Sequence, residues 1–189
     1  MKIVRRISAV AAAMLITLGI ALSPAAPASA AGFFDENVEP AYLQNSEAGL
    51  CMDDYALSGS VYQYPCNAQD NEWWKWRKPF PSSGNVWHIG LGVGRYSPHK
   101  CLYPEGVAYY SRITLRICNN LNTRQQWAEH KVGNFSYFES LYAPGKCIGA
   151  LVGPSISEMV LAECVVRPSI LFKKVLLSQG PPPPGRVWG

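Results

Sequence analysis

Six cysteines recur at regular intervals along this 189-residue chain and constrain its fold more than any other feature. The gaps between them run 15, 35, 17, 29 and 17 residues. Six cysteines can pair in many ways, and the alternation of short and long gaps favours pairing across each short gap. The alternative, a zinc site, needs close pairs such as Cys-x₂₋₄-Cys, and the sequence has none. We therefore expect three local disulfides, Cys51–Cys66, Cys101–Cys118 and Cys147–Cys164.

The sequence around these cysteines repeats three times. An alternating apolar segment leads into the second cysteine of each pair, at residues 61–66, 113–118 and 159–164. A large aromatic residue follows each time, as Trp74, Trp127 and Phe172. Short alternating segments between Gly, Pro and Asn clusters predict many short strands, and no segment after residue 30 keeps a helical period. Three such units can close into a pseudo-threefold all-β domain without exposed sheet edges.

The first thirty residues have the pattern of a signal peptide. A basic start at residues 1–6 precedes an uncharged apolar run at residues 7–22, and small residues lead to a cleavage site after Ala30. The alternative is a membrane anchor, but this run is shorter than the roughly 20 residues that span a bilayer. We therefore expect a secreted, extracellular protein, in which disulfides persist.

Removal of that segment changes the charge of the chain. The segment carries three basic residues and no acidic one, so the net charge of +4 falls to +1. Binding to nucleic acid or to an anionic membrane surface depends on a basic surface. We therefore expect no nucleic-acid partner and no insertion into a membrane.

The three units resemble the repeats of ricin-type β-trefoil lectins, which carry a Gln-x-Trp signature. The segment Gln125-Gln126-Trp127 matches this signature fully, Glu72-Trp73-Trp74 has Glu in place of Gln, and Ile170-Leu171-Phe172 is a degenerate third copy. The resemblance implies a six-stranded barrel capped by three hairpins. It also implies that the signature residues serve the core, namely Trp74, Gln125, Trp127 and Phe172.

The resemblance extends over residues 41–177, with repeats at about 41–87, 88–134 and 135–177, after an N-terminal extension at 31–40. Residues 178–189 follow it and contain four consecutive prolines, which favour a stiff polyproline II segment. We expect a disordered tail there. The alternative is a spacer that presents Trp188 to a partner.

The resemblance also implies a sugar site in the first repeat. A functional repeat of these lectins has an Asp two residues after the first cysteine, an aromatic two before the second, and an Asn three before the signature Trp. The first repeat has all three, as Asp53, Tyr64 and Asn71. The family's Gln is displaced, because Tyr62 stands at its position and Gln63, which we include in the site, lies beside it.

These residue types suit a sugar. A carboxylate accepts two hydroxyl protons, an amide both donates and accepts, and an aromatic ring stacks on the apolar face of a pyranose. The alternative is that they are unrelated turn residues, since Asp and Asn favour turns. The second repeat has Tyr103, Arg116 and Arg124 at the three positions, and the third has Gly149, Ala162 and Ser169. We expect both of these repeats to serve as scaffold or to bind something other than sugar.

The expected function is that of a monomeric carbohydrate-binding protein that takes glycans or polysaccharides at one site. The alternative is a degenerate trefoil that binds a protein partner, as an inhibitor or toxin-associated module, with a vestigial sugar site. We expect no catalytic residue, no metal and no cofactor, because the three histidines lack a neighbouring nucleophile motif. Six paired cysteines also leave no free thiol.

Overall fold

Twelve β-strands and four short 3₁₀ helices make up the computed structural model, which describes residues 34, 38–55, 58–81, 84–91, 99–151 and 156–183. The first repeat contains β1 (Ala41–Asn45), β2 (Cys51–Asp54), β3 (Val61–Tyr64), η2 (Asp70–Glu72) and β4 (Trp74–Arg77). The second contains β5 (Val86–Leu91), β6 (Lys100–Pro104), β7 (Ile113–Ile117), η3 (Thr123–Gln125) and β8 (Gln126–Val132). The third contains β9 (Phe135–Ser140), β10 (Lys146–Ala150), β11 (Ser157–Glu163), η4 (Pro168–Ile170) and β12 (Phe172–Leu176), with η5 (Leu177–Gln179) after it.

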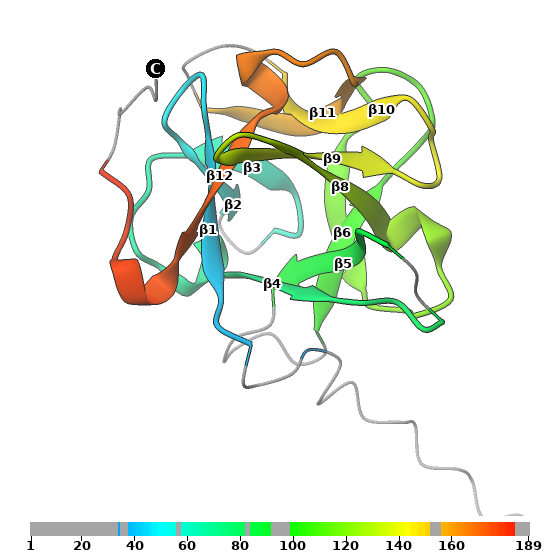
Figure 1. Ribbon diagram of the computed structural model, residues 1–189, viewed down its shortest axis with the longest axis horizontal. Helices are drawn as coiled ribbons and strands as arrows, with labels where there is room; N and C mark the ends of the chain where they lie inside the picture. Colours follow the sequence, from blue (N-terminus) through cyan, green and yellow to red (C-terminus); the bar gives the residue numbers. More distant parts are fainter. Residues whose placement is uncertain are drawn as a thin grey trace, which may run out of the picture.

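Six of these strands close a barrel. Strand β1 pairs with β4, β4 with β5, β5 with β8, β8 with β9, β9 with β12, and β12 returns to β1, all antiparallel. The first and last strand of each repeat thus lie in the barrel wall (Figure 1). Closure leaves no free edge in this ring, which is the condition that prevents edge-to-edge aggregation.

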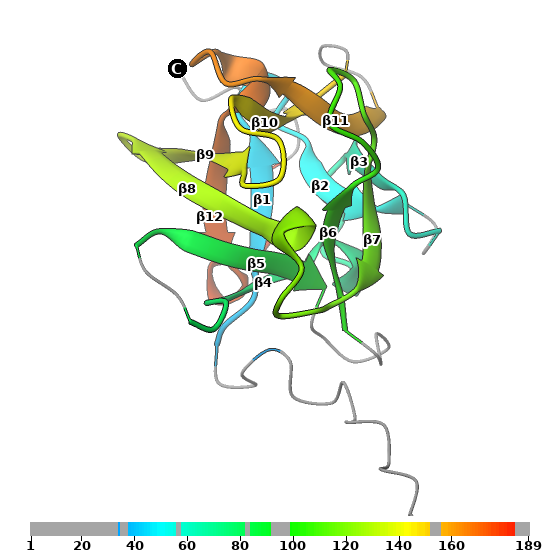
Figure 2. The same cartoon turned by 90° about the vertical axis from the view of Figure 1, so that its right-hand side faces the viewer.

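The middle strands of each repeat form a hairpin, and the three hairpins cap the barrel. They are β2–β3, β6–β7 and β10–β11. Strand β11 pairs with β3, and single bridges join Ser60 to Thr114 and Arg112 to Val160, so each hairpin contacts the next. Figure 2 shows the hairpins grouped towards one end of the barrel. The expected all-β trefoil of three repeats is confirmed.

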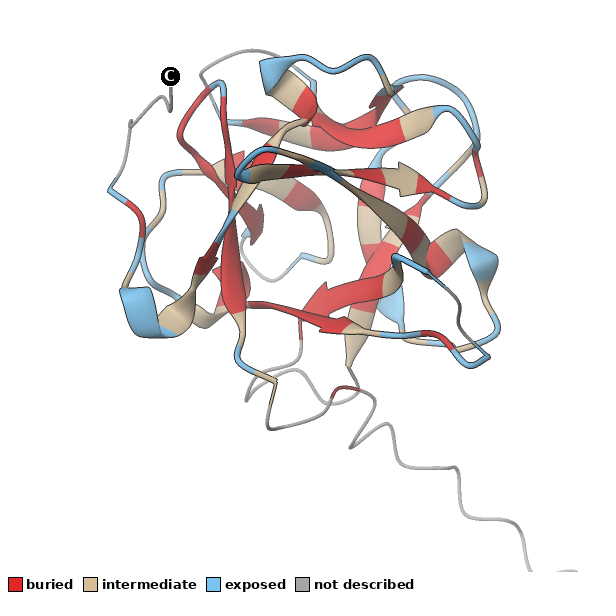
Figure 3. Cartoon of the chain, viewed as in Figure 1, coloured by how far each residue is buried: buried red, intermediate tan, exposed pale blue. Residues whose placement is uncertain are grey.

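The signature aromatic residues fill the barrel, as the sequence predicted. Trp74, Trp127 and Phe172 are buried in one apolar cluster. Figure 3 colours much of the barrel strands β1, β4 and β5 as buried. The indole N–H of Trp74 donates to the carbonyl of Met52, and that of Trp127 donates to the carbonyl of Leu102. In the two repeats with an intact signature Trp, the indole on the barrel strand thereby anchors the cap hairpin of its own repeat.

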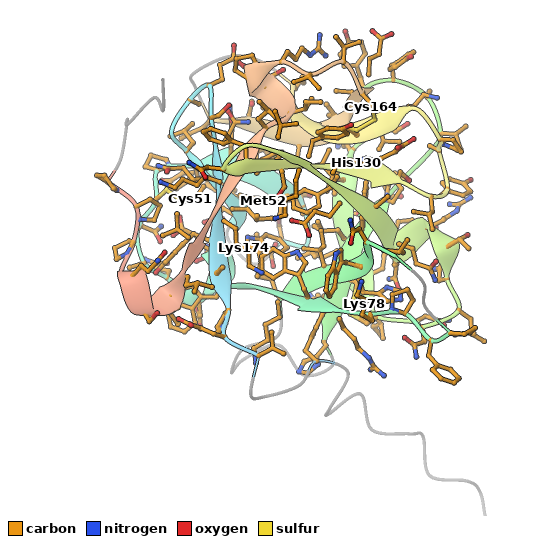
Figure 4. The ribbon with its side chains drawn as sticks, in the orientation of Figure 1. Cys51, Met52, Lys78, His130, Cys164 and Lys174 are labelled. Atoms are coloured by element: carbon orange, nitrogen blue, oxygen red, sulfur yellow. A yellow bond between two sulfur atoms is a disulfide. The ribbon has the colours of Figure 1, made fainter. Side chains whose placement is uncertain are left out.

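The three predicted disulfides are present. Cys51–Cys66, Cys101–Cys118 and Cys147–Cys164 each span 15 to 17 residues, and their Cα–Cα distances are 5.0 to 5.1 Å. Cys51 and Cys164, labelled in Figure 4, mark the first and the third of these bonds. Each disulfide joins the start of a cap hairpin to the chain just after its second strand, so it closes the hairpin within its own repeat.

The structure describes part of the N-terminal region. The predicted signal peptide lies outside the described residues. In the extension, Phe34 is buried and its ring lies 5.5 Å from that of His99. Strand β5, which we assign to the second repeat, begins at Val86, close to the repeat boundary expected at about 87.

The predicted Pro-rich tail begins within helix η5 (Leu177–Gln179), and its residues 178–183 are among those described. The Gln44 side chain donates to the Pro183 carbonyl at 3.3 Å. Trp188 lies outside the described residues. Within the part of the chain that is described, no helix is long and apolar enough to cross a membrane.

Candidate functional site

The two faces of the β2–β3 hairpin separate the predicted site residues. Residues directly opposite each other on paired strands point to the same face. Asp53 lies opposite Tyr62 and Cys51 lies opposite Tyr64, so these four share the outer face. Met52, a member of the core cluster, lies opposite Gln63.

Gln63 is therefore not brought to the other predicted site residues. Its amide donates to the Ser157 hydroxyl at 3.0 Å, across the pairing of β3 with β11. The side chain is buried and links two cap hairpins. Its inclusion in the sugar site needs correction, because strand alternation turns position 63 away from the face that carries Asp53.

Asp53 and Asn71 do meet. Helix η2 places Asn71 beside the end of β2, and its side-chain N–H donates to Asp53 Oδ2 at 2.9 Å. Asp53 is 1% exposed and Asn71 is 8% exposed, so both are more buried than a solvent-facing pocket would leave them. Among the described residues, neither Asp53 Oδ1 nor Asn71 Oδ1 has a hydrogen-bond partner, and buried oxygens of this kind are rarely left so.

Two further carboxyl groups, those of Asp54 and Glu72, lie near this pair. Burial raises the pKa of Asp53 to about 7, the neighbouring Asp54 adds to the rise, and the hydrogen bond from Asn71 opposes it. Burial also raises the pKa of Asp54, although the Gly59 N–H donates to its carboxylate at 2.7 Å. The Asp53 carboxyl is thus poised to change charge near neutral pH.

Glu72 is the third carboxyl and replaces the signature Gln. Burial raises its pKa to about 7, and the nearby Asp53 adds to this, while backbone hydrogen bonds from Asn67 and Ala68 oppose it. Those backbone N–H groups lie 3.0 to 3.2 Å from the carboxylate oxygens. Its second-repeat equivalent, Gln125, accepts from a backbone N–H in the same way and also donates to a carbonyl. Glu72 accepts backbone hydrogen bonds as Gln125 does, but an ionised carboxylate cannot donate a hydrogen bond to a carbonyl.

Tyrosine rings surround the outer face of the hairpin. The Tyr55 ring lies 5.4 Å from that of Tyr62 and 5.5 Å from that of Tyr64, both tilted. Tyr55 is exposed, and the other two are partly buried. The Tyr62 hydroxyl donates to Glu158 at 3.1 Å. The sequence did not indicate Tyr55, because nothing in its spacing from the cysteines marks it. Tyr62 could have been identified, because the alternation of side chains along a strand places it on the same face as Asp53 and places Gln63 on the other.

The second repeat has a different pair at the same positions. Arg124 donates to the Tyr103 hydroxyl at 2.6 Å, where the first repeat has Asn71 and Asp53. Arg116, opposite Cys101 as Tyr64 is opposite Cys51, is exposed. The pair of a carboxyl and an amide in the first repeat is thus replaced by a pair of a tyrosine and an arginine in the second.

The third repeat has no room at these positions. Gly149, Ala162 and Ile170 are buried, and the last two pack together with Cys147. A methyl group added at Gly149 would lie 2.9 Å from Ala162 Cβ and 3.1 Å from Ile170 Cγ2. Apolar side chains fill the place that polar side chains occupy in the first repeat.

Solved structures share this fold at low sequence identity. ThreeFoil, a designed 3-fold symmetric protein, matches with a TM-score of 0.63 and 16% identity, over 72% of this chain and 97% of that one. A lectin from Polyporus squamosus, solved with the epitope Neu5Acα2-6Galβ1-4GlcNAc, matches with a TM-score of 0.60 and 12% identity, over 74% of this chain and 49% of that one. The BEL β-trefoil matches with a TM-score of 0.58 and 13% identity, over 75% of this chain and 94% of that one.

Larger proteins contain a similar unit. An exo-β-1,3-galactanase from Clostridium thermocellum matches with a TM-score of 0.63 and 15% identity, over 76% of this chain but only 31% of the enzyme. No model of a known protein family and no curated protein sequence matches the chain. At these identities the likeness concerns the fold, and the closed barrel, the three cap hairpins and the solved structures agree on it. The chain is a β-trefoil, similar in structure to β-trefoil lectins.

Proposed function

We propose that this protein binds carbohydrate at one site, on the outer face of the β2–β3 hairpin in the first repeat. The observation that carries the proposal is the Asp53–Asn71 pair, which is buried yet leaves one oxygen of each side chain without a hydrogen-bond partner among the described residues. Buried acceptors cost free energy unless a donor reaches them. Two vicinal hydroxyls of a sugar supply such donors.

Each residue has a distinct part in the proposed site. Asp53 accepts sugar hydroxyls in charge-assisted hydrogen bonds once it is ionised. Asn71 holds the Asp53 carboxylate through its N–H and offers its own oxygen to a hydroxyl. Tyr64, or the exposed Tyr55 beside it, offers a ring on which the apolar face of a pyranose stacks.

The proposed role is binding without catalysis, outside the cell and by a monomer. The arrangement favours binding because the carboxyl at its centre already pairs with an amide and has no nucleophile partner on the described face. Three disulfides suit an oxidising compartment. The resemblance of the sequence to ricin-type lectins and the likeness of the fold to solved lectins support the same role.

A glycan array tests the proposal. We expect binding to a restricted set of neutral glycans, at about millimolar strength for a single monosaccharide, and competition by that free monosaccharide. An array with no competed signal at protein concentrations near that affinity would contradict a sugar-binding role.

Protein binding is the second candidate, favoured by an exposed loop. The β6–β7 connection exposes Val107, Tyr109 and Tyr110, and Tyr110 has a left-handed φ of 64°. Exposed aromatic side chains are enriched where protein surfaces meet. Under this candidate, replacing these residues by serine abolishes capture of the partner, and Asp53→Asn has no effect on it.

A further inference from the structure

Two guanidinium groups flank one tyrosine ring in the second repeat. The Arg124 guanidinium carbon lies 5.4 Å from the centre of the Tyr103 ring, and that of Arg116 lies 6.0 Å from it. Arg124 also lies 4.1 Å from the centre of the Tyr142 ring and donates to both tyrosine hydroxyls. Tyr142 belongs to the connection between β9 and β10, so Arg124 is held between two repeats.

Among the described residues, Glu105 is the one carboxylate that pairs with these two positive charges. Glu105 accepts from Arg116 at 2.7 Å and from the Thr114 hydroxyl at 2.5 Å. The Thr114 hydrogen bond lowers the pKa of Glu105, and Arg116 and Arg124 add to this, so the carboxylate stays ionised. Arg124 has no carboxylate hydrogen-bonded to it in the part of the chain that the structure describes, since its side chain donates to two neutral hydroxyls. One positive charge in the cluster is therefore uncompensated.

Arg124 is also preorganised to bind an anion. A guanidinium has five N–H donors in a fixed plane, and the two tyrosine hydroxyls take only part of them. Stacking on Tyr142 fixes the plane before any ligand arrives, which lowers the entropy cost of binding. Arg116, more than half exposed, can turn from Glu105 to the same anion.

We propose that this cluster, Tyr103, Glu105, Arg116, Arg124 and Tyr142, is a second binding site that takes an anionic group, a carboxylate or a sulfate, of an acidic polysaccharide. The site goes beyond the proposed sugar site because it uses none of the residues of the first repeat. It occupies the same positions of its own repeat as Asp53, Tyr64 and Asn71 do of theirs, with the opposite charge. A guanidinium pair donates to two oxygens of the carboxylate or sulfate, and the tyrosine rings contact the sugar that carries it.

Binding of two probe polymers tests the site. Polygalacturonate supplies carboxylates, dextran sulfate supplies sulfates, and neutral dextran is the blank. We expect the full chain to bind at least one acidic polymer and not the blank, with an affinity that falls as salt rises. Tighter binding of polygalacturonate assigns carboxylate as the ligand group, and tighter binding of dextran sulfate assigns sulfate.

Two charge variants give opposite results if the inference holds. Arg116→Gln weakens binding about three- to tenfold by removing one charged donor. Glu105→Gln strengthens it about two- to fivefold, because the competing carboxylate is gone. Arg167→Gln, the same charge change on an exposed residue of the third repeat, alters it less than about twofold. Arg124→Gln also weakens binding, and thermal melting separates this from the loss of its bonds to the two tyrosines.

The opposing outcomes are distinct from those of the proposed sugar site. Equal affinities in the Arg116→Gln, Glu105→Gln and Arg167→Gln variants overturn the second site, since the cluster would then be structural. Equally tight binding of single-stranded DNA with the same dependence on Arg116 overturns the assignment to polysaccharides. Neutral-glycan binding measured on the same Arg116→Gln protein reports the first repeat by itself, so either site can fail while the other stands.

Discussion

At the scale of single residues, the first repeat holds buried carboxyl groups whose pKa values are raised. The pKa values of Asp53 and Glu72 rise to about 7 from ordinary values of 3.8 and 4.5, with burial as the largest cause. The signature position held by Gln125 in the second repeat needs no charge to accept a backbone hydrogen bond. Glu72 therefore makes the fold pH-sensitive at a position where an amide would not.

The sign of that sensitivity follows from proton binding. Between about pH 4 and pH 7 the folded protein holds protons on Asp53 and Glu72 that the unfolded chain has released, so stability falls as pH rises through this window. Glu72→Gln removes part of this dependence and supplies a donor like that of Gln125. We expect the variant to melt about 2–4 °C above the parent at pH 8, the shift that roughly 1 kcal/mol produces in a chain of this size, with a smaller gain at pH 5.

Melting curves at pH 5, 6, 7 and 8 measure the effect. If the curves of the parent and the Glu72→Gln variant stay parallel over this range, burial of Glu72 has not raised its pKa.

At the scale of elements, each repeat folds as a strand, a disulfide-closed hairpin, a 3₁₀ turn and a second strand. The turns η2, η3 and η4 end at Glu72, Gln125 and Ile170, the first residue of each signature copy. This placement brings residue 71, 124 or 169 next to the first strand of the cap hairpin in its own repeat. The difference between repeats then depends on the side chains that meet there.

The third repeat provides a direct test of this comparison. Gly149→Ala adds a methyl group 2.9 Å from Ala162 Cβ and 3.1 Å from Ile170 Cγ2, both in a buried cluster. Overpacking of this kind costs about 1–3 kcal/mol of unfolding free energy, measured by urea denaturation. In the control, Gly106→Ala, the nearest atom is the Ser111 hydroxyl oxygen at 2.8 Å, the end of a side chain that can rotate away, so it costs less. Equal costs for both variants would mean that there is free space around position 149 in the third repeat.

The features predicted correctly from sequence are those set by local spacing. Cysteine intervals predicted the disulfides, and the resemblance to ricin-type lectins, carried by aromatic residues that recur in register, implied the barrel core. The misassignment of Gln63 was avoidable, since strand alternation places it opposite Met52 on the core face. The burial of Asp53 could not be read from spacing, because it depends on how η2 packs on the end of β2.

At the scale of the whole molecule, three copies of one unit have diverged in charge and packing. The first repeat has the buried pair of a carboxyl and an amide, Asp53 and Asn71. The second has arginines beside tyrosines, and the third is filled by apolar side chains. The pseudo-threefold barrel tolerates this divergence of the cap residues, because its core depends on the signature aromatic residues, which point into the barrel. The signature aromatic residues of the core thus lie on barrel strands, whereas the proposed sugar site lies on a cap hairpin.

The proposal of one sugar site per chain has a consequence for crosslinking. Lectins that agglutinate particles do so through repeated sites. We expect that beads coated with a neutral glycan that this protein binds do not aggregate when the protein is added. We also expect sedimentation to show a monomer. Aggregation by a protein that sediments as a monomer would mean that a second repeat binds the same neutral sugar.

The most direct test of the account is the affinity of the Asp53→Asn variant for the neutral glycan that the array identifies, measured by titration calorimetry at pH 8. Asparagine keeps the volume and the contact with Asn71 but removes the charge, and a hydrogen bond to a charged group is worth about 1.5–3 kcal/mol. The account predicts a folded variant, checked by circular dichroism, that binds at least about tenfold more weakly, while Tyr103→Phe in the second repeat binds like the parent. Unchanged affinity in a folded Asp53→Asn variant would contradict a sugar site in the first repeat.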